Sequence, residues 1–180
     1  MKYRNRKNAQ AAAAYWGKPL DRPDWYEVKG QGDGAGEIFI YDVIGWPIND
    51  VYDLVRSLGN YGDLTVRINS PGGDVFDGVA LFNALRNHKG GAVTTRVEGL
   101  AASMASVVML AGEEVQAHEN TMVMIHDPWT CMCGNQYELR EVANILSGIS
   151  EQMLDTYYDK TGQGKRDLKM VMTWPKNSPA

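Results

Sequence analysis

The sequence lacks the features that mark several large classes of protein. Its 180 residues contain no apolar run of about 18 residues, the least that a membrane-spanning helix needs. The two cysteines, Cys131 and Cys133, are too close for an ordinary disulfide and have no set of zinc ligands nearby. We therefore expect a cytoplasmic protein in which both cysteines lie in an ordinary loop.

A strong charge bias is also missing. The formal net charge is −4, and 44% hydrophobic with 22% charged residues is the balance of an ordinary globular domain. The basic residues within positions 2–7 form a local cluster, which we expect to be a solvated tail. Residues 1–24 lack periodicity and are predicted to be a flexible N-terminal arm, with one domain over residues 25–180. We expect no nucleic-acid or membrane partner.

What the sequence does contain is an alternation of strands and helices. The apolar patterns predict strands over residues 37–44, 64–68, 92–97 and 121–125, and helices from Val51, from Val75, over 103–111 and over 137–158. This alternation predicts an α/β fold with parallel strands. The last helix carries an apolar stripe from Leu139 to Tyr157, which is longer than a small core requires and favours self-association.

Ser103 is the candidate nucleophile for acyl transfer. It stands in Gly99-Leu-Ala-Ala-Ser-Met-Ala-Ser, after small residues that let a substrate backbone come close. A helix is predicted to begin at Ser103, so its hydroxyl lies near the positive end of a helix dipole. The alternative is an ordinary N-cap serine. Ser106 is the less favoured nucleophile because it lies about one turn further into the helix.

Gly72 and Gly73 directly follow the strand predicted over residues 64–68. Paired glycines leave backbone N–H groups accessible and add no side chain. Together with the N–H of Met104 they are one way to build an oxyanion hole. The alternative is a plain type II turn after Pro71.

His126 is the candidate general base. It ends the strand predicted over residues 121–125, and Pro128 stops that strand. An imidazole there is the usual acceptor for the proton of a nucleophilic hydroxyl. The alternative is a structural histidine. His88 and His118 lie in polar surroundings and are assigned no role.

Three separated blocks together resemble the proteolytic subunit of the Clp protease. They are Ile68-Asn-Ser-Pro-Gly-Gly-Asp, Ala101-Ala-Ser-Met-Ala and Met124-Ile-His-Asp-Pro. The longer segments Arg67-Ile-Asn-Ser-Pro-Gly-Gly-Asp-Val-Phe-Asp-Gly and His126-Asp-Pro-Trp look most like the Clp-like head maturation (prohead) proteases of tailed phages and prophages. The resemblance covers about residues 25–163, and the blocks match in order and spacing.

The resemblance implies a crotonase-like fold, a right-handed spiral of ββα units with a long handle helix after Gly134. It implies a serine endopeptidase in which Ser103 attacks the scissile carbonyl, His126 accepts the proton, and the backbones of Gly72 and Met104 bind the oxyanion. It also implies a ring-shaped oligomer that needs no cofactor or metal. The implied substrate is a capsid or scaffold protein, cleaved in the host cytoplasm or within the procapsid.

The third residue of the triad departs from the family pattern. The family has an aspartate shortly before an aromatic residue, matched here by Trp174, but residues 170–172 are Met-Val-Met. Asp167 lies too early, and Asp127 would point to the opposite face of its strand. Ala180 comes before the family's final strand and helix would be complete, so the domain looks truncated. We expect slow peptidase activity or none.

Three hypotheses follow. The first is an active maturation peptidase, with a housekeeping Clp subunit served by an ATPase unfoldase as its variant. The second is a catalytically impaired ring protein that serves as a structural or interaction module. The third is a coenzyme A enzyme of the same fold class, which has no need of the Ser103–His126 pairing. The phage-like segments favour the maturation enzyme.

Overall fold

The computed structural model describes residues 25–30, 34–45 and 51–172. The arm predicted over residues 1–24 lies outside the described residues, and so does Trp174. The chain divides into two compact units, Met1–Val123 and Met124–Ala180. No helix in the described part of the chain combines the length and the apolar character that crossing a membrane requires.

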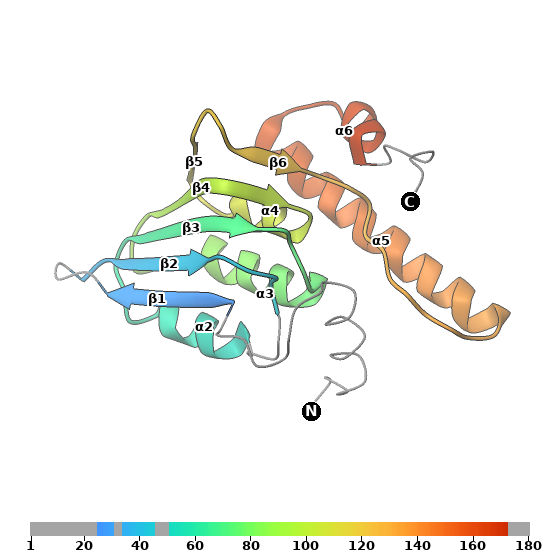
Figure 1. The fold of residues 1–180 in the computed structure, drawn as a ribbon, viewed down its shortest axis with the longest axis horizontal. Helices are drawn as coiled ribbons and strands as arrows, with labels where there is room; N and C mark the ends of the chain where they lie inside the picture. The colour runs from blue at the N-terminus through green and yellow to red at the C-terminus, as the bar shows by residue number, and fades with distance from the viewer. Residues whose placement is uncertain (1–24, 31–33, 46–50, 173–180) are drawn as a thin grey trace. The chain divides into compact units, whose positions relative to one another are not determined.

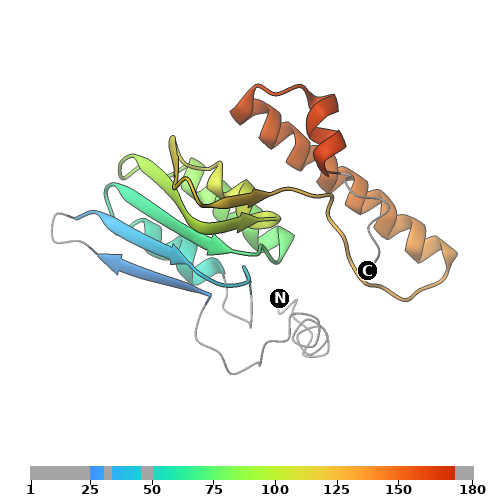
Figure 2. The ribbon, with the colours of Figure 1, turned by 45° about the horizontal axis from the view of Figure 1, so that its top comes forward.

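The first unit is a sheet with helices on one face. Its strands are β1 (Tyr26–Gly30), β2 (Gly36–Ile40), β3 (Leu64–Ser70), β4 (Val93–Ala102), β5 (Glu114–Ala117) and β6 (Met122–Met124), which reaches the division between the units. Its helices are α2 (Val51–Leu58), α3 (Val75–Arg86) and α4 (Met104–Met109). The strand order is β1-β2-β3-β4-β5, and β6 also pairs with β4. Figures 1 and 2 show α2, α3 and α4 on the same side of this sheet.

The strands from β2 to β5 are parallel, which confirms the α/β prediction for the centre of the sheet. β1 is an exception, because it pairs antiparallel with β2, from Tyr26 opposite Ile40 to Gly30 opposite Gly36. The alternation of strands and helices could not indicate this strand, since only residues 31–35 separate β1 from its antiparallel partner β2, too few for a crossover helix. The short strand β5 was also missed.

Side chains alternate along the strands between the core and the open face of the sheet. In β3, Leu64, Val66 and Ile68 are fully buried, whereas Thr65 and Arg67 point to the opposite side and are half-buried. This period of two is the one that a half-covered sheet imposes. The helices supply the other side of the core, with fully buried Leu54, Leu81, Leu85 and Val108.

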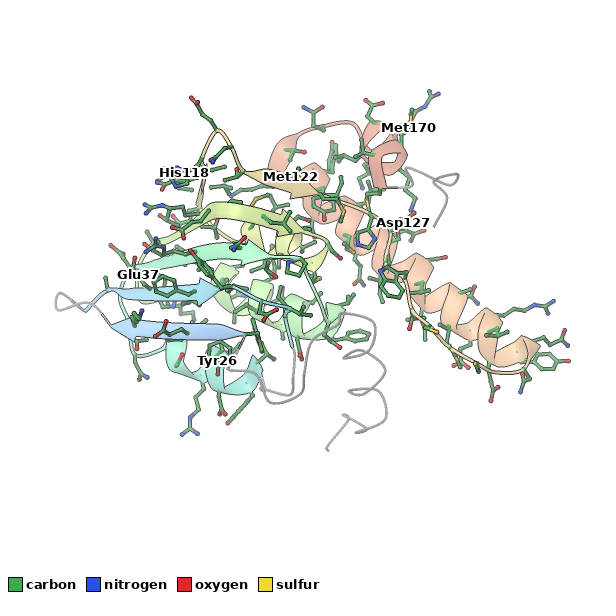
Figure 3. All side chains as sticks on the ribbon, in the orientation of Figure 1. Tyr26, Glu37, His118, Met122, Asp127 and Met170 are labelled. Carbon is green, nitrogen blue, oxygen red and sulfur yellow. The ribbon has the colours of Figure 1, made fainter. Side chains whose placement is uncertain are left out.

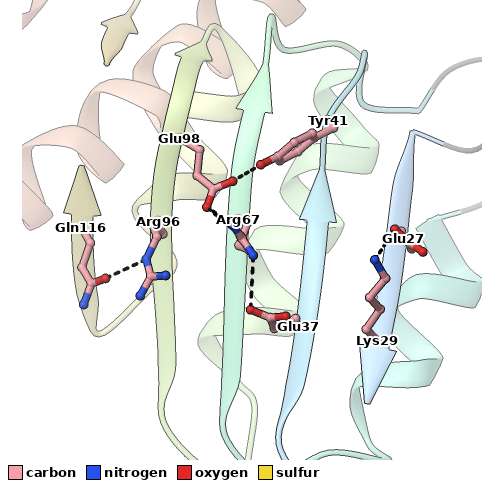
Figure 4. A network of polar contacts seen from close by, with 8 residues as sticks. All are labelled: Glu27, Lys29, Glu37, Tyr41, Arg67, Arg96, Glu98 and Gln116. Carbon is pink, nitrogen blue, oxygen red and sulfur yellow. Dashed lines mark hydrogen bonds and ion pairs between the residues drawn. The ribbon is translucent and has the colours of Figure 1, made fainter. Parts of the chain in front are cut away.

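The open face of the sheet carries a polar network instead of an apolar layer (Figure 4). Arg67 contacts Glu98 at 2.6 Å and Glu37 at 3.6 Å. Its guanidinium lies 4.9 Å from the centre of the Phe39 ring, and Tyr41 donates to Glu98 as well. These charges pair within the sheet, so this face has its own internal stabilisation.

The second unit is dominated by helix α5 (Gln136–Thr161), followed by α6 (Lys165–Met172). Asn135 and Glu138 form a capping box at the start of α5, and Gly162 ends it in the left-handed conformation with φ 67°. The helix predicted over residues 137–158 is therefore confirmed and slightly longer, whereas α6 was not predicted. In α5 the buried residues, Ser150, Met153 and Tyr157, lie in the second half of the helix.

Candidate active site

Ser103 is the single residue that links strand β4 to helix α4. Its backbone has φ 54° and ψ −127°, and it is the only non-glycine residue with positive φ in the described ranges. Holding an L-residue there costs about 1–3 kcal/mol, so the surrounding structure must enforce it. In α/β-hydrolases, a strained strand-to-helix turn exposes the nucleophilic serine. The alternative of an N-cap serine is not supported, because the side chain makes no capping hydrogen bond.

Ser106 is placed very differently. It is fully buried, and its Oγ donates to the carbonyl oxygen of Ser103 at 2.6 Å. Its backbone N–H donates to the same oxygen at 3.0 Å. A substrate carbonyl cannot reach a hydroxyl in that position, so the geometry favours Ser103 of the two serines.

The glycine pair lies directly against the Ser103 turn. A Cβ added to Gly72 would lie 2.6 Å from the Cβ of Ser103 and 2.9 Å from the backbone nitrogen of Met104. A Cβ added to Gly73 would lie 2.2 Å from the carbonyl oxygen of Ile44. Both glycines have positive φ, 98° and 152°. Gly72 can approach the Ser103 turn, and Gly73 the backbone of Ile44, this closely only because neither glycine has a side chain.

The backbone donors near Ser103 differ in what they already contact. The N–H of Gly72 donates to the Oγ of buried Ser70 at 3.1 Å, and that Oγ donates to the carbonyl oxygen of Asp42 at 2.7 Å. The N–H of the adjoining Gly73 has no hydrogen-bond acceptor among the described residues. Met104 is the first residue of α4, where backbone N–H groups have no partner within the helix. The Gly72 N–H, which is predicted to bind the oxyanion, thus already donates a hydrogen bond to Ser70.

The side chain of Met104 anchors this turn. It is buried, and a Cβ added to Gly78 of α3 would lie 2.2 Å from its Cγ. Gly78 therefore leaves the space on α3 that the Met104 side chain fills. All six residues of α4 are buried, so the backbone at its start is held by the core rather than by solvent-exposed contacts.

His126 belongs to the second unit, whereas Ser103 belongs to the first. The pairing of these two side chains therefore remains a prediction. His126 is half-buried, and the next residue is tied to the end of α6 by a hydrogen bond of 2.9 Å from the N–H of Asp127 to the carbonyl oxygen of Met172. The residues expected at the place of the triad acid do lie beside the His126 segment, but Met172 presents a backbone carbonyl there.

Neither candidate acid has the surroundings of a triad aspartate. Asp167 is exposed in the first turn of α6. The Oδ1 atom of Asp127 accepts hydrogen bonds from Lys169 Nζ at 2.7 Å and from Ser150 Oγ. Burial by itself raises the pKa of the Asp127 carboxyl, but the hydrogen bonds from Lys169 and Ser150, the charge of Lys169 and the electrostatic interaction with His126 lower it overall.

The contacts among Asp127, Ser150 and Lys169 could not be found from the sequence. Asp127 is 23 positions from Ser150 and 42 from Lys169 along the chain, and neither Ser150 nor Lys169 stands in a motif. Only the fold of the second unit brings them together. The nearest signal was the position of Asp127 directly after His126.

The comparisons with known proteins cover the part of the chain that carries the candidate residues. A model of the Clp protease family matches residues 35–174. The ATP-dependent Clp protease proteolytic subunit 2 of Parasynechococcus marenigrum is 33% identical over 103 residues, 56% of this chain and 52% of that relative. The ATP-dependent Clp protease proteolytic subunit of Deinococcus radiodurans is 32% identical over 110 residues, 60% of this chain and 53% of that relative. The chain thus spans about half the length of the curated relatives it matches, and it belongs to the Clp protease family.

Proposed function

We propose that this chain is a serine endopeptidase of the Clp type, with Ser103 as the nucleophile and His126 as the general base. The observation that carries the proposal is the strained backbone of Ser103 between β4 and α4, pressed against Gly72. Strain of about 1–3 kcal/mol at a half-buried turn residue without a capping hydrogen bond is typical of a reactive residue.

The reaction follows from the roles of these groups. Ser103 Oγ attacks the carbonyl carbon of the scissile peptide while its proton passes to His126. The oxygen of the tetrahedral intermediate is stabilised by the N–H of Met104 and by the glycine turn. We assign the second donor to Gly72, with Gly73 as the competing donor because Ser70 already engages the Gly72 N–H. The protonated His126 then protonates the leaving amine, and water hydrolyses the acyl-enzyme.

The test is hydrolysis of a fluorogenic peptide by matched variants. Ser103→Ala and His126→Ala should each abolish most of the parent activity, whereas His118→Ala should not change it. His118 is the matched control because it is exposed and lies in the turn between β5 and β6 (Figure 3). Equal rates for the parent and Ser103→Ala would overturn the proposal.

The finer role that we propose is head maturation, with capsid or scaffold protein as substrate, in the host cytoplasm or the procapsid. The phage-like segments around Arg67 and His126 support it. The alternative is a housekeeping subunit, since the relatives bear the name ATP-dependent Clp protease proteolytic subunit. Incubation with procapsid protein, compared with unfolded protein plus an ATPase unfoldase, separates the two roles by which substrate is cleaved.

We also propose that the chain forms a ring in which α5 serves as the handle of a crotonase-like spiral. Exposed Tyr137, Leu139 and Ile145 on the first half of α5 support this assembly. Analytical ultracentrifugation should show a species several times the mass of the 20.0 kDa chain at micromolar concentration. A monomer alone would contradict it.

A catalytically impaired ring protein is the second candidate. It is favoured by the backbone carbonyl of Met172 beside the His126 segment and by the exposed side chains of Met170 and Val171, where the family has its acid. Loss of the acid slows a serine protease by about four orders of magnitude, although oxyanion donors keep some acceleration. Peptide hydrolysis near that residual rate, still dependent on Ser103, would identify this case.

A further inference from the structure

Three polar side chains from three different segments meet beside His126. Lys169 Nζ of α6 lies 2.7 Å from Asp127 Oδ1 and 2.6 Å from Ser150 Oγ of α5. Ser150 Oγ also donates to Asp127 Oδ1. Asp127, Ser150 and Lys169 are called the clamp below; Figure 3 labels Asp127 and shows α5 and α6 beside it.

The clamp is partly shielded from water. Ser150 is 5% exposed, and the side chains of Lys169 and Asp127 are 42% and 35% exposed. Each donor is aimed at an acceptor, so the cluster is satisfied internally. Because Lys169 donates to Ser150 rather than accepting its proton, and because Ser150 is buried, the pair is not arranged as a second Ser–Lys nucleophile.

The same short segment is also held through its backbone. The N–H of Asp127 donates to the carbonyl oxygen of Met172, one turn away from Lys169 on α6. The residue after His126 is thus fixed by a backbone bond and by an ion pair to the same helix. Anchoring Asp127 fixes the backbone at the adjacent His126, and so the point from which the His126 side chain extends.

We propose that Asp127, Ser150 and Lys169 position His126 by locking the segment that carries it to α5 and α6. This deepens the proposed function and rests on it, since positioning matters for catalysis only if His126 is the base. In this role Asp127 is a positioning residue and not the acid of the triad. The two roles can be distinguished by exchanging the charges of Asp127 and Lys169. An ion pair that only positions His126 still forms after the exchange, whereas a triad acid is lost.

The experiment compares five variants in the full chain. Asp127→Asn and Lys169→Met each remove one half of the ion pair. Lys169→Arg keeps the charge, and Asp127→Lys combined with Lys169→Glu exchanges the charges. The matched control is Lys165→Met, which breaks another ion pair of α6, at 2.5 Å to Asp155, away from the His126 segment.

Two signals are read for each variant. The first is the rate at which a fluorophosphonate labels Ser103. The second is the ring resonances of His126 in a long-range nitrogen–proton spectrum, with His88 and His118 of the first unit as internal controls. The second signal does not depend on activity, so it tests the clamp even if Ser103 proves unreactive and the proposed function fails.

The clamp predicts that Asp127→Asn and Lys169→Met slow labelling by about 10- to 100-fold, because a misplaced base loses that much. Both should shift the His126 resonances. Lys169→Arg and Lys165→Met should behave like the parent, and the exchanged pair should recover most of the rate. The proposal is wrong if Lys169→Met leaves both the labelling rate and the His126 resonances unchanged. It is also wrong if Asp127→Asn is the only single variant that slows labelling and the exchanged pair recovers none of the rate, because a triad acid would give that result.

Discussion

The turn at Ser103 and the segment at His126 are held in place by different kinds of contact. Around Ser103, backbone packs on backbone, with Gly72 so close that any side chain would collide. After His126, Asp127 is held by an ion pair with Lys169, a hydrogen bond from Ser150 and a backbone hydrogen bond to Met172. Steric contacts of the first kind are insensitive to pH and salt, whereas the second kind depends on charge. The two halves of the proposed site should therefore fail under different perturbations.

The largest effect is expected from adding a methyl group at the Ser103 turn. Gly72→Ala places a Cβ 2.6 Å from that of Ser103 and 2.8 Å from the Ala102 carbonyl oxygen, at φ 98°. We expect it to abolish labelling of Ser103 and to lower the free energy of unfolding by more than about 2 kcal/mol. Labelling with a fluorophosphonate and urea unfolding measure the two effects.

Gly34→Ala is the control for this change. Gly34 has a similar φ of 87° but no heavy atom within 4 Å of an added Cβ. Gly34→Ala has the cost of the left-handed backbone conformation but no steric collision. It should therefore lower the free energy of unfolding by less than Gly72→Ala does, and leave labelling of Ser103 intact. Equal losses in both variants would mean that the close approach to Ser103 contributes nothing.

An intermediate effect is expected from an ion pair within the sheet. Arg67→Met removes contacts to Glu98 and Glu37 and the stacking on Phe39, from a side chain that is 30% exposed. We expect a loss of about 1 kcal/mol in the free energy of unfolding. The control Lys29→Met breaks an exposed pair with Glu27 and should change stability by less than about 0.5 kcal/mol. Thermal unfolding at two salt concentrations compares them, and a larger loss for Lys29→Met would contradict the ranking.

The smallest change in stability is expected at Asp127, and it should depend on pH. Burial raises the pKa of this carboxyl, but the hydrogen bonds from Lys169 and Ser150, together with the electrostatic interactions with Lys169 and His126, lower the pKa overall. Its stabilisation is thus complete above the unfolded pKa of about 3.9 and is lost as pH falls through the lower folded value. Asp127→Asn should cost about 0.2–1 kcal/mol at neutral pH and almost nothing in strong acid.

Unfolding of the parent and of Asp127→Asn across pH 7 to pH 2 measures this difference. Unfolding of Gly72→Ala over the same pH range serves as the comparison, because the loss caused by a steric contact does not depend on protonation of Asp127. A difference between the parent and Asp127→Asn that grows as the pH falls would show that the carboxylate is not stabilised by Lys169.

Most of the central sheet could be predicted from the sequence, because each of β2, β3 and β4 carries a clear apolar pattern next to a turn or helix signal. The strand β1 and the helix α6 could not. β1 is mostly polar and half-exposed, and α6 has only Leu168 and Met172 buried. Elements of this kind form because other elements pack against them, and the sequence pattern does not show which elements those are.

The candidate site divides in the same way. Ser103 and the glycine pair could be placed together because small residues next to strand ends leave few alternatives. The engagement of the Gly72 N–H by Ser70 and the clamp at Asp127 could not, since both depend on side-chain contacts set by the fold. The pairing of Ser103 with His126 remains a prediction.

The most direct test of the central claim is the site of modification by a fluorophosphonate, read by mass spectrometry of the digested protein. The account predicts one modified residue, Ser103, in the parent and in Ser106→Ala. It predicts no modification of Ser103→Ala and a much slower reaction of His126→Ala. Modification of Ser103→Ala at the parent rate, or of a different residue in the parent, would contradict it.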